Sequence, residues 1–266
     1  MYLQIEKKSS RSERLRSAIC GLLSFSLLTA AFPPIGWSLL VFLAWIPFFV
    51  DIQRTRGRVF WPGFLLGEAF FGSALLYWIT AMTTVGAASY VVWFGVSFLH
   101  VLFALPLGFF LRWLLRRGVS VFWAAPLPFA AQSFLREKVT NIAWHDPGYA
   151  LADWTLCLQS AEWGGPQVLS LMGMFCSAGL AELWLAKNGA ARWSKRGALI
   201  CGGGLLLCLV ALPAWGAWRI RDLEGQLKTG PLVAGIQPNV TLEERADPKI
   251  SPYDLYSRRL DLTERV

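Results

Sequence analysis

Thiols are the side chains in this 266-residue chain with the greatest nucleophilic potential. The cysteines are Cys20, Cys157, Cys176, Cys201 and Cys208. Four lie inside apolar segments, where a thiol acts as a small hydrophobic group, and no Cys-x-x-Cys pair suggests a zinc site. Cys157 lies in a polar stretch near Asp153 and Glu162, but carboxylates raise a thiol pKa and no lysine is close. We therefore predict no catalytic residue, metal site or cofactor site within these residues.

Two ionisable residues lie in the middle of apolar segments. Glu68 is costly in lipid there, so it is either functional, or protonated or paired between helices. For His100, a hydrogen bond to a neighbouring helix is favoured over a proton relay. Glu182 lies near the end of its apolar segment, with Lys187 five residues later, and is expected to reach towards the interface.

The longest polar stretch between apolar segments, residues 136–167, is rich in aromatic and acidic side chains. These are Trp144, His145, Asp146, Tyr149, Asp153, Trp154, Glu162 and Trp163. Such a mixture suits the headgroup level of a bilayer, either as an interfacial anchor or in contact with a substrate. His145 and Asp146 lack the further partners that a hydrolase triad needs, so we expect no nucleophilic site there.

Membrane helices must position these residues. Hydrophobic residues make up 55% of the chain and charged residues 16%, against roughly 25% charged in soluble domains. This composition excludes an ordinary soluble enzyme, a disordered chain and a coiled coil. A helix needs about 20 apolar residues to cross a bilayer. On that basis we predict an all-α polytopic membrane protein with seven transmembrane segments: Ser17–Phe32, Ile35–Ile52, Phe64–Met82, Ala88–Leu115, Val119–Leu135, Val168–Ala186 and Ala198–Trp215.

Basic residues alternate between the two sides of these segments. Fifteen of the 25 fall before the first segment and in every second connection: Lys7, Lys8, Arg11, Arg14, Arg16, Arg54, Arg56, Arg58, Arg112, Arg116, Arg117, Lys187, Arg192, Lys195 and Arg196. The positive-inside rule then predicts a cytoplasmic N-terminus (residues 1–16) and an external segment after residue 215. The net charge of +8 is orienting charge, and nucleic acid is not an expected partner.

The tail, residues 216–266, has a different character. Leu232–Gln237 is a short apolar run that predicts a buried strand. Ser251, Pro252 and Asp254 have the spacing of a helix N-terminus with a capping box. One strand and one helix cannot bury both their apolar faces, so we expect the tail to begin a larger α/β domain. Either the sequence is a fragment, or another chain supplies the rest.

Several local motifs, taken in order, resemble those of bacterial apolipoprotein N-acyltransferases. They are Ala31-Phe32-Pro33-Pro34, Phe71-Gly72 with Tyr77-Trp78, Phe134-Leu135-Arg136 followed by Trp144 and Gly148-Tyr149, and Ile236-Gln237-Pro238-Asn239. The resemblance covers nearly the whole chain. This chain departs from the family pattern at Asn141-Ile142-Ala143-Trp144 and at Arg245-Ala246.

The resemblance implies a fold, an activity and site residues. It implies a nitrilase-like αββα domain that begins at residue 216, in an enzyme of the bacterial inner membrane. The enzyme would transfer an acyl chain from a membrane phospholipid to the α-amino group of a diacylglyceryl-cysteine lipoprotein. Trp144 and Tyr149 would contact substrate, and Pro33, Pro34, Arg136, Gly148, Gln237 and Asn239 would be structural motif residues. The family's catalytic Glu, Lys and Cys lie beyond its opening strand and helix, in segments that residues 1–266 do not contain. Residues 1–266 alone are therefore expected to be inactive.

A non-catalytic membrane module that binds lipid or an assembly partner is the alternative interpretation. A small-molecule transporter is disfavoured, because an odd number of segments cannot form two equal halves and few charges lie within them.

Overall fold

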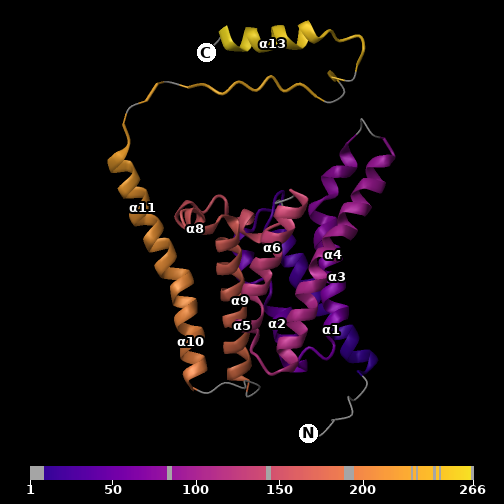
Figure 1. Cartoon of the computed structure of the whole chain (residues 1–266), viewed down its shortest axis with the longest axis vertical. Coiled ribbons are helices and arrows are strands. Elements are labelled where there is room, and N and C mark those ends of the chain that lie inside the picture. Colours follow the sequence, from indigo (N-terminus) through magenta and orange to yellow (C-terminus); the bar gives the residue numbers. More distant parts are fainter. Residues whose placement is uncertain are drawn as a thin grey trace.

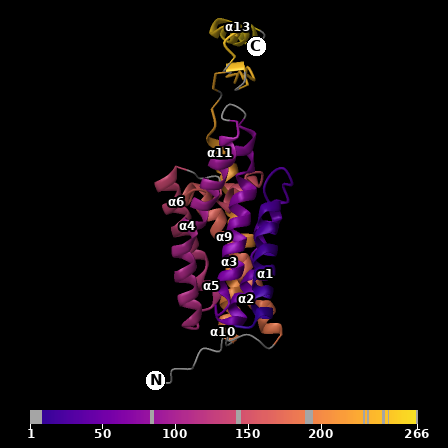
Figure 2. The same cartoon turned by 90° about the vertical axis from the view of Figure 1, so that its right-hand side faces the viewer.

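The computed structural model describes residues 9–82, 86–141, 145–188, 195–228, 230–231, 233–241, 244–245 and 247–264. Most of these form helices that run roughly along one common axis (Figure 1; Figure 2). The α-helices are α1 Arg11–Ala30, α2 Ile46–Thr55, α3 Phe60–Leu75, α4 Ala88–Arg116, α5 Val121–Ala124, α6 Pro126–Thr140, α7 Thr155–Leu158, α8 Ala161–Gly164, α9 Pro166–Lys187, α10 Lys195–Leu206, α11 Leu212–Gln226 and α13 Pro252–Glu264. Short 3-10 turns are η1 Ser38–Phe42, η2 Tyr77–Ala81 and η4 Pro147–Leu151, and a π-helical turn, η5 Leu207–Ala211, joins α10 to α11.

Five helical segments in the described part of the chain are long and apolar enough to cross a membrane. They are Ser38–Thr55, Phe60–Ala81, Ala88–Arg116, Pro166–Lys187 and Leu199–Gln226. They overlap five of the seven predicted segments, so the membrane character is confirmed and the count of seven is not reproduced. The other two predicted segments correspond to α1 and to α5 with α6. Helix α1 carries Arg11, Glu13, Arg14 and Arg16 in its first turns, which shortens its apolar part. Helix α6 has only 15 residues, because it starts at Pro126 and is separate from α5. Both nevertheless pack within the bundle.

Aromatic side chains fill the centre of the bundle. Phe48, Phe60 and Phe64 are buried and stack on one another between α2 and α3. Helix α9 is central, because it packs against α2, α6 and α10 and has the largest buried share among the five segments. The core therefore depends on α9 as well as on the aromatic residues.

Helices α1 and α3 approach each other through glycine. A Cβ on Gly63 would overlap the backbone carbonyl of Ser17, and a Cβ on Gly21 would overlap Gly63 itself. The Ser17 hydroxyl donates to the Val59 carbonyl at 2.6 Å. Small residues and interhelical hydrogen bonds are how helices associate in lipid, where apolar surface alone gives little preference for a neighbour.

The start of α1 and the ends of α2 and α4, which carry many of the described basic residues, lie together at one end of the bundle (Figure 1). There Arg58 pairs with Glu13, Arg112 donates to the Gly57 carbonyl, and Arg54 lies over the Trp184 ring. These contacts join the start of α1 to the ends of α2, α4 and α9. The described parts of connections that the alternation of basic residues assigns to one side of the membrane therefore lie at the same end of the bundle.

The expectation that Glu182 reaches towards the membrane interface is wrong. Its side chain is buried near the end of α9 and accepts a hydrogen bond from the Ser120 hydroxyl at 2.6 Å. It does not reach towards the interface, because Ser120, at the start of α5, provides a partner inside the bundle.

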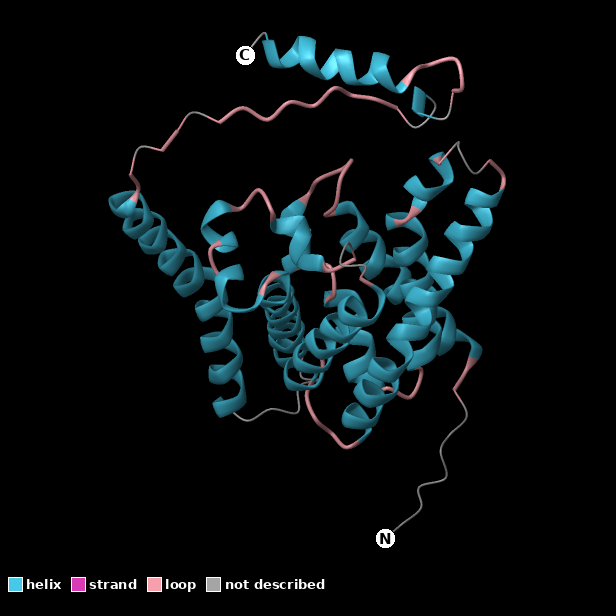
Figure 3. Cartoon of the chain, turned by 45° about the horizontal axis from the view of Figure 1, so that its top comes forward, coloured by secondary structure: helices cyan, strands magenta, loops and turns pink. Residues whose placement is uncertain are grey.

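The tail lies beyond the opposite end of the bundle. Helix α11 runs through residue 216 to Gln226 before the chain leaves the bundle. The predicted strand at 232–237 is not present among the residues described there, which are extended without strand pairing (Figure 3). No described strand lies beside this segment, so its backbone has no ladder partner. The predicted helix is confirmed as α13. At its start the Asp254 carboxylate accepts from the Ser251 amide, and the Ser251 hydroxyl accepts from the Tyr253 amide, so only one of the two bonds of a capping box is formed.

Candidate functional site

A buried polar network joins α3, α4 and α6. Glu68 Oε2 lies 3.0 Å from His100 Nε2, and Arg136 Nη1 lies 3.3 Å from His100 Nδ1. Because a guanidinium has only donors, His100 Nδ1 must accept, and Nε2 therefore carries the proton and donates to Glu68. The three side chains are 4 to 5% exposed. Of the two interpretations of Glu68, the structure favours pairing between helices, and the same holds for His100.

Asp146 extends this network to α9. The Ser133 hydroxyl donates to Asp146 Oδ2 at 2.5 Å, and the Ser170 hydroxyl donates to Oδ1. The Gly148 amide donates to Asp146 Oδ1 at 3.0 Å. Arg136 Nη2 donates to Ser133 Oγ at 3.4 Å, which closes the connection. A continuous chain of hydrogen bonds thus runs from Glu68 on α3 to Ser170 on α9, and each buried charge has a polar partner.

His145 lies beside this network without a hydrogen bond. It is 3% exposed, and its ring centroid is 4.8 Å from that of His100. Both ring nitrogens, and Nε of Arg136, lack a partner among the residues described. Burial, and secondarily the positive charge of the nearby Arg136, lower the pKa of His145 to about 2, so its imidazole is neutral. These groups border a cavity of about 10 Å³, the scale of one water molecule.

The network holds η4, which carries Tyr149. Gly148 is buried so tightly that a Cβ would overlap the Pro166 carbonyl. Tyr149 is 42% exposed, and burial, with smaller effects from Glu137 and Asp146, raises the pKa of its phenol. The other predicted substrate contact, Trp144, lies outside the described residues.

The remaining motif residues are spread over the molecule. Pro33 and Pro34 form a cis peptide bond just after α1. Gln237 and Asn239 are exposed in the extended tail, where Asn239 adopts a left-handed backbone (φ 53°). The structure therefore brings together Arg136 and Gly148 through Asp146, and it does not bring the tail or Pro33 and Pro34 to them.

No activated thiol accompanies the network. Burial raises the pKa of the Cys157 thiol, which makes no hydrogen bond to a carboxylate or lysine. The part of the chain that the structure describes also holds no cluster of metal-ligating side chains. The arrangement can position η4 and exclude water from buried charges. It supplies no nucleophile for covalent catalysis.

Two members of the network, Ser133 and Ser170, were not predicted from the sequence. Ser133 precedes Arg136 by three residues, so both lie on one face of a helix, and that spacing was a usable signal. Ser170 is one of two serines in the sequence of α9, and nothing in its local sequence distinguishes it.

Comparisons with known proteins match this chain to one family. Residues 24–179 match the apolipoprotein N-acyltransferase N-terminal domain. The apolipoprotein N-acyltransferase of Geobacter metallireducens is 28% identical over 256 residues, which cover 92% of this chain and 48% of that protein. The enzyme so named in Gloeobacter violaceus is 26% identical over 212 residues, covering 70% of this chain and 38% of that protein. The chain thus spans about half or less of these relatives, and it belongs to the apolipoprotein N-acyltransferase N-terminal domain family.

Proposed function

We propose that this chain is the membrane module of an apolipoprotein N-acyltransferase. The enzyme would move an acyl chain from a membrane phospholipid to the α-amino group of a diacylglyceryl-cysteine lipoprotein. The observation that supports this is the family match over residues 24–179, a range that contains the whole network from Glu68 to Ser170.

The chemistry proposed is a two-step acyl transfer. A thiolate attacks the ester carbonyl of the phospholipid and releases a lysophospholipid, and the lipoprotein amine then attacks the thioester and restores the thiol. In this proposal the thiol, a carboxylate base and a lysine belong to a nitrilase-like domain that residues 216–266 begin. The protein lies in the bacterial inner membrane, with seven spans, a cytoplasmic N-terminus and a periplasmic tail. The start of α1 at one end of the bundle and the position of α13 beyond the other end support that topology (Figure 1).

The role proposed for the network is to hold a substrate-contacting loop. Asp146 and Gly148 are buried and hydrogen-bonded to Ser170 of α9, whereas the next residue, Tyr149, is exposed. A fixed backbone with an exposed ring suits contact with lipid headgroups. We therefore retain Tyr149 and Trp144 as substrate contacts.

The test uses a longer version of the protein that continues past Val266. Transfer of a labelled acyl chain from phospholipid to a diacylated lipopeptide is measured for Trp144→Ala and Tyr149→Ala. We expect a higher KM for at least one substrate. Trp123→Ala, an exposed aromatic on α5 near the opposite end, is the matched control. If both loop variants keep the KM values of the parent, the loop is an interfacial anchor.

Residues 1–266 alone are expected to show no transfer, because no thiol among the described residues is hydrogen-bonded to a carboxylate or a lysine that could activate it. Turnover above background that Cys157→Ala abolishes would refute this placement of the chemistry.

A non-catalytic membrane module is the second candidate. It is supported by α13, where Tyr253, Tyr256 and Leu260 are exposed on one face and available to a partner. Absence of transfer by the longer version, together with retained insertion in the membrane, would favour this candidate.

A further inference from the structure

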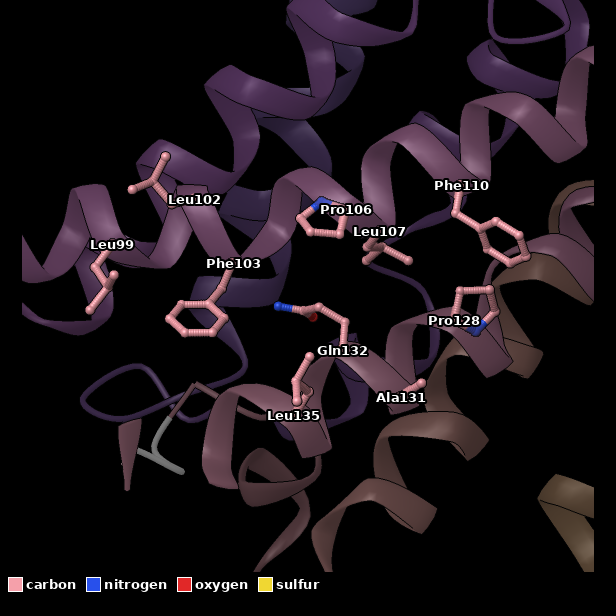
Figure 4. A pocket seen from close by; sticks show the side chains of 10 residues that line it. All are labelled: Leu99, Leu102, Phe103, Pro106, Leu107, Phe110, Pro128, Ala131, Gln132 and Leu135. Atoms are coloured by element: carbon pink, nitrogen blue, oxygen red, sulfur yellow. The ribbon is translucent and has the colours of Figure 1, made fainter. Parts of the chain in front are cut away.

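An apolar groove runs along the lipid-facing side of α4 and α6. Its volume is about 640 Å³. Figure 4 shows the side chains that line it: Leu99, Leu102, Phe103, Pro106, Leu107 and Phe110 from α4, and Pro128, Ala131, Gln132 and Leu135 from α6. No ionised side chain lines it, so it suits a hydrocarbon chain.

The groove continues into a basic depression at the C-terminal end of α4. This depression, of about 790 Å³, shares Pro106 and Phe110 with the groove and adds Phe109, Arg112, Trp113, Arg116 and Arg117. Three arginines and no acidic side chain therefore line the depression at the end of the apolar groove.

Two of these arginines, Arg112 and Arg117, differ from others at the same end of the bundle. Arg16 pairs with Asp51 at 2.7 Å and Arg58 pairs with Glu13 at 2.8 Å, so those charges are neutralised within the protein. Arg112 donates to the Gly57 carbonyl through Nε, and the Arg117 guanidinium lies 4.2 Å from the centre of the Trp113 ring. These contacts orient both side chains without cancelling their charge.

The length of the groove matches one leaflet. Leu99 and Phe110 are eleven residues apart on α4, or about 16 Å along the helix at 1.5 Å per residue. Half of a typical hydrocarbon core is about 15 Å. A single acyl chain whose headgroup lies at Arg112, Arg116 and Arg117 would fill this length.

We propose that this groove is a binding site for an anionic phospholipid of the leaflet on the N-terminal side. The headgroup phosphate lies among the three arginines, and one acyl chain lies between α4 and α6. Basic depressions between membrane helices recognise anionic headgroups through this complementarity. The arginines lie about 18 Å or more along α4 from His100, so the headgroup position is separate from the network, and the proposal does not depend on the proposed transfer reaction.

The test uses the 266-residue chain in phosphatidylcholine nanodiscs. A trace of phosphatidylglycerol with a photoreactive diazirine on one acyl chain is added, and the same phosphatidylcholine probe is used in parallel. Crosslinked peptides are mapped by mass spectrometry. We expect the phosphatidylglycerol probe to label residues of the groove, such as Leu102 and Leu135, more strongly than the phosphatidylcholine probe.

Two variants and one control decide the outcome. Replacing Arg112, Arg116 and Arg117 together with Gln is expected to lower phosphatidylglycerol labelling of the groove by about tenfold. Replacing Arg11, Arg14 and Arg56 with Gln removes the same charge from the same side and should leave the labelling intact. Ala131→Phe fills the groove and keeps the arginines, so it should abolish labelling even if the triple variant fails to fold. Equal labelling by both probes in the parent, or equal loss in both triple variants, would overturn the proposal.

Discussion

Five polar residues on four parts of the chain stabilise one another: Glu68, His100, Ser133, Arg136 and Asp146. Each would be costly to bury alone, because a charge without a partner loses its hydration. The order carboxylate, neutral imidazole, guanidinium, hydroxyl and carboxylate gives every link a donor and an acceptor. The consequence at the level of the residue is that removal of Glu68, His100 or Arg136 leaves a ring nitrogen of His100 or the Glu68 carboxylate without its hydrogen-bond partner.

Arg136→Gln is therefore expected to lower the free energy of unfolding by about 3 kcal/mol, because the buried acceptors His100 Nδ1 and Ser133 Oγ lose their charged donor. Thermal unfolding in detergent measures this loss. Arg11→Gln, at an exposed position of the same residue type, is the control and should change little. Similar unfolding temperatures for the two variants would show that the network does not stabilise the fold.

His145 predicts a pH dependence. Its pKa is 6.5 as a free side chain and about 2 in the folded protein. Between these values the unfolded chain binds one proton more than the folded chain, so stability falls as the pH is lowered through 6.5. The loss is at most about 1.4 kcal/mol per pH unit. Unfolding temperatures at pH 7.5 and pH 5 should differ less for His145→Gln than for the parent, and equal differences would contradict the burial of a neutral imidazole. The titratable and charged neighbours of position 145, His100 and Arg136, are the same in the parent and in the His145→Gln variant, so the comparison isolates the His145 imidazole.

At the scale of elements, the contact between α1 and α3 has a specific requirement. The two helices approach through Gly21 and Gly63 so closely that neither position has room for a Cβ. The close approach allows Ser17 on α1 to bond to the backbone at Val59, just before α3. This contact acts with the hydrogen bond from the Phe48 amide to Ser24 and the ion pair of Arg16 with Asp51 to hold α1 in the bundle.

Gly63→Ala is expected to destabilise the protein by about 2 kcal/mol, because the new methyl group forces the helices apart. Gly95→Ala is the matched control, since Gly95 lies inside α4 with open space around its Cα. That change should be neutral or slightly stabilising, as alanine favours a helix more than glycine does. Equal thermal stability of the two variants would refute the close packing of α1 on α3.

At the scale of the whole molecule, the two ends of the bundle differ in chemistry. The end with the N-terminus collects arginines that pair with carboxylates, carbonyl groups and aromatic rings. The opposite end holds η4 and the exposed tail (Figure 1). The positive-inside rule relates such a difference in basic residues between the two ends to the orientation of the protein in the membrane.

Cysteine labelling tests the orientation. Ser10→Cys should react only from the cytoplasmic side and Ser257→Cys only from the periplasmic side, in a background that carries Cys20→Ser. The other four cysteines are buried and give little signal. Labelling of Ser257→Cys from the cytoplasm alone would invert the proposed topology.

The sequence by itself determined that this is a helical membrane protein, where five of its spans lie, and that one helix begins at Pro252. Those features depend on local properties: the length of apolar runs, the position of charges and the capping residues. The tail shows the limit of such reasoning, because Leu232–Gln237 has the composition of a strand, yet a strand exists only beside another strand.

Tertiary structure decided the site. The sequence indicated that Glu68 and His100 need explanations, but it could not show that they share one hydrogen bond, since 32 residues separate them. It also could not place Glu182 against Ser120, or Ser170 against Asp146. Which polar groups meet across a bundle depends on how helices rotate and pack, and packing is set by distant residues such as Gly63 and not by the neighbours of each polar group in the chain.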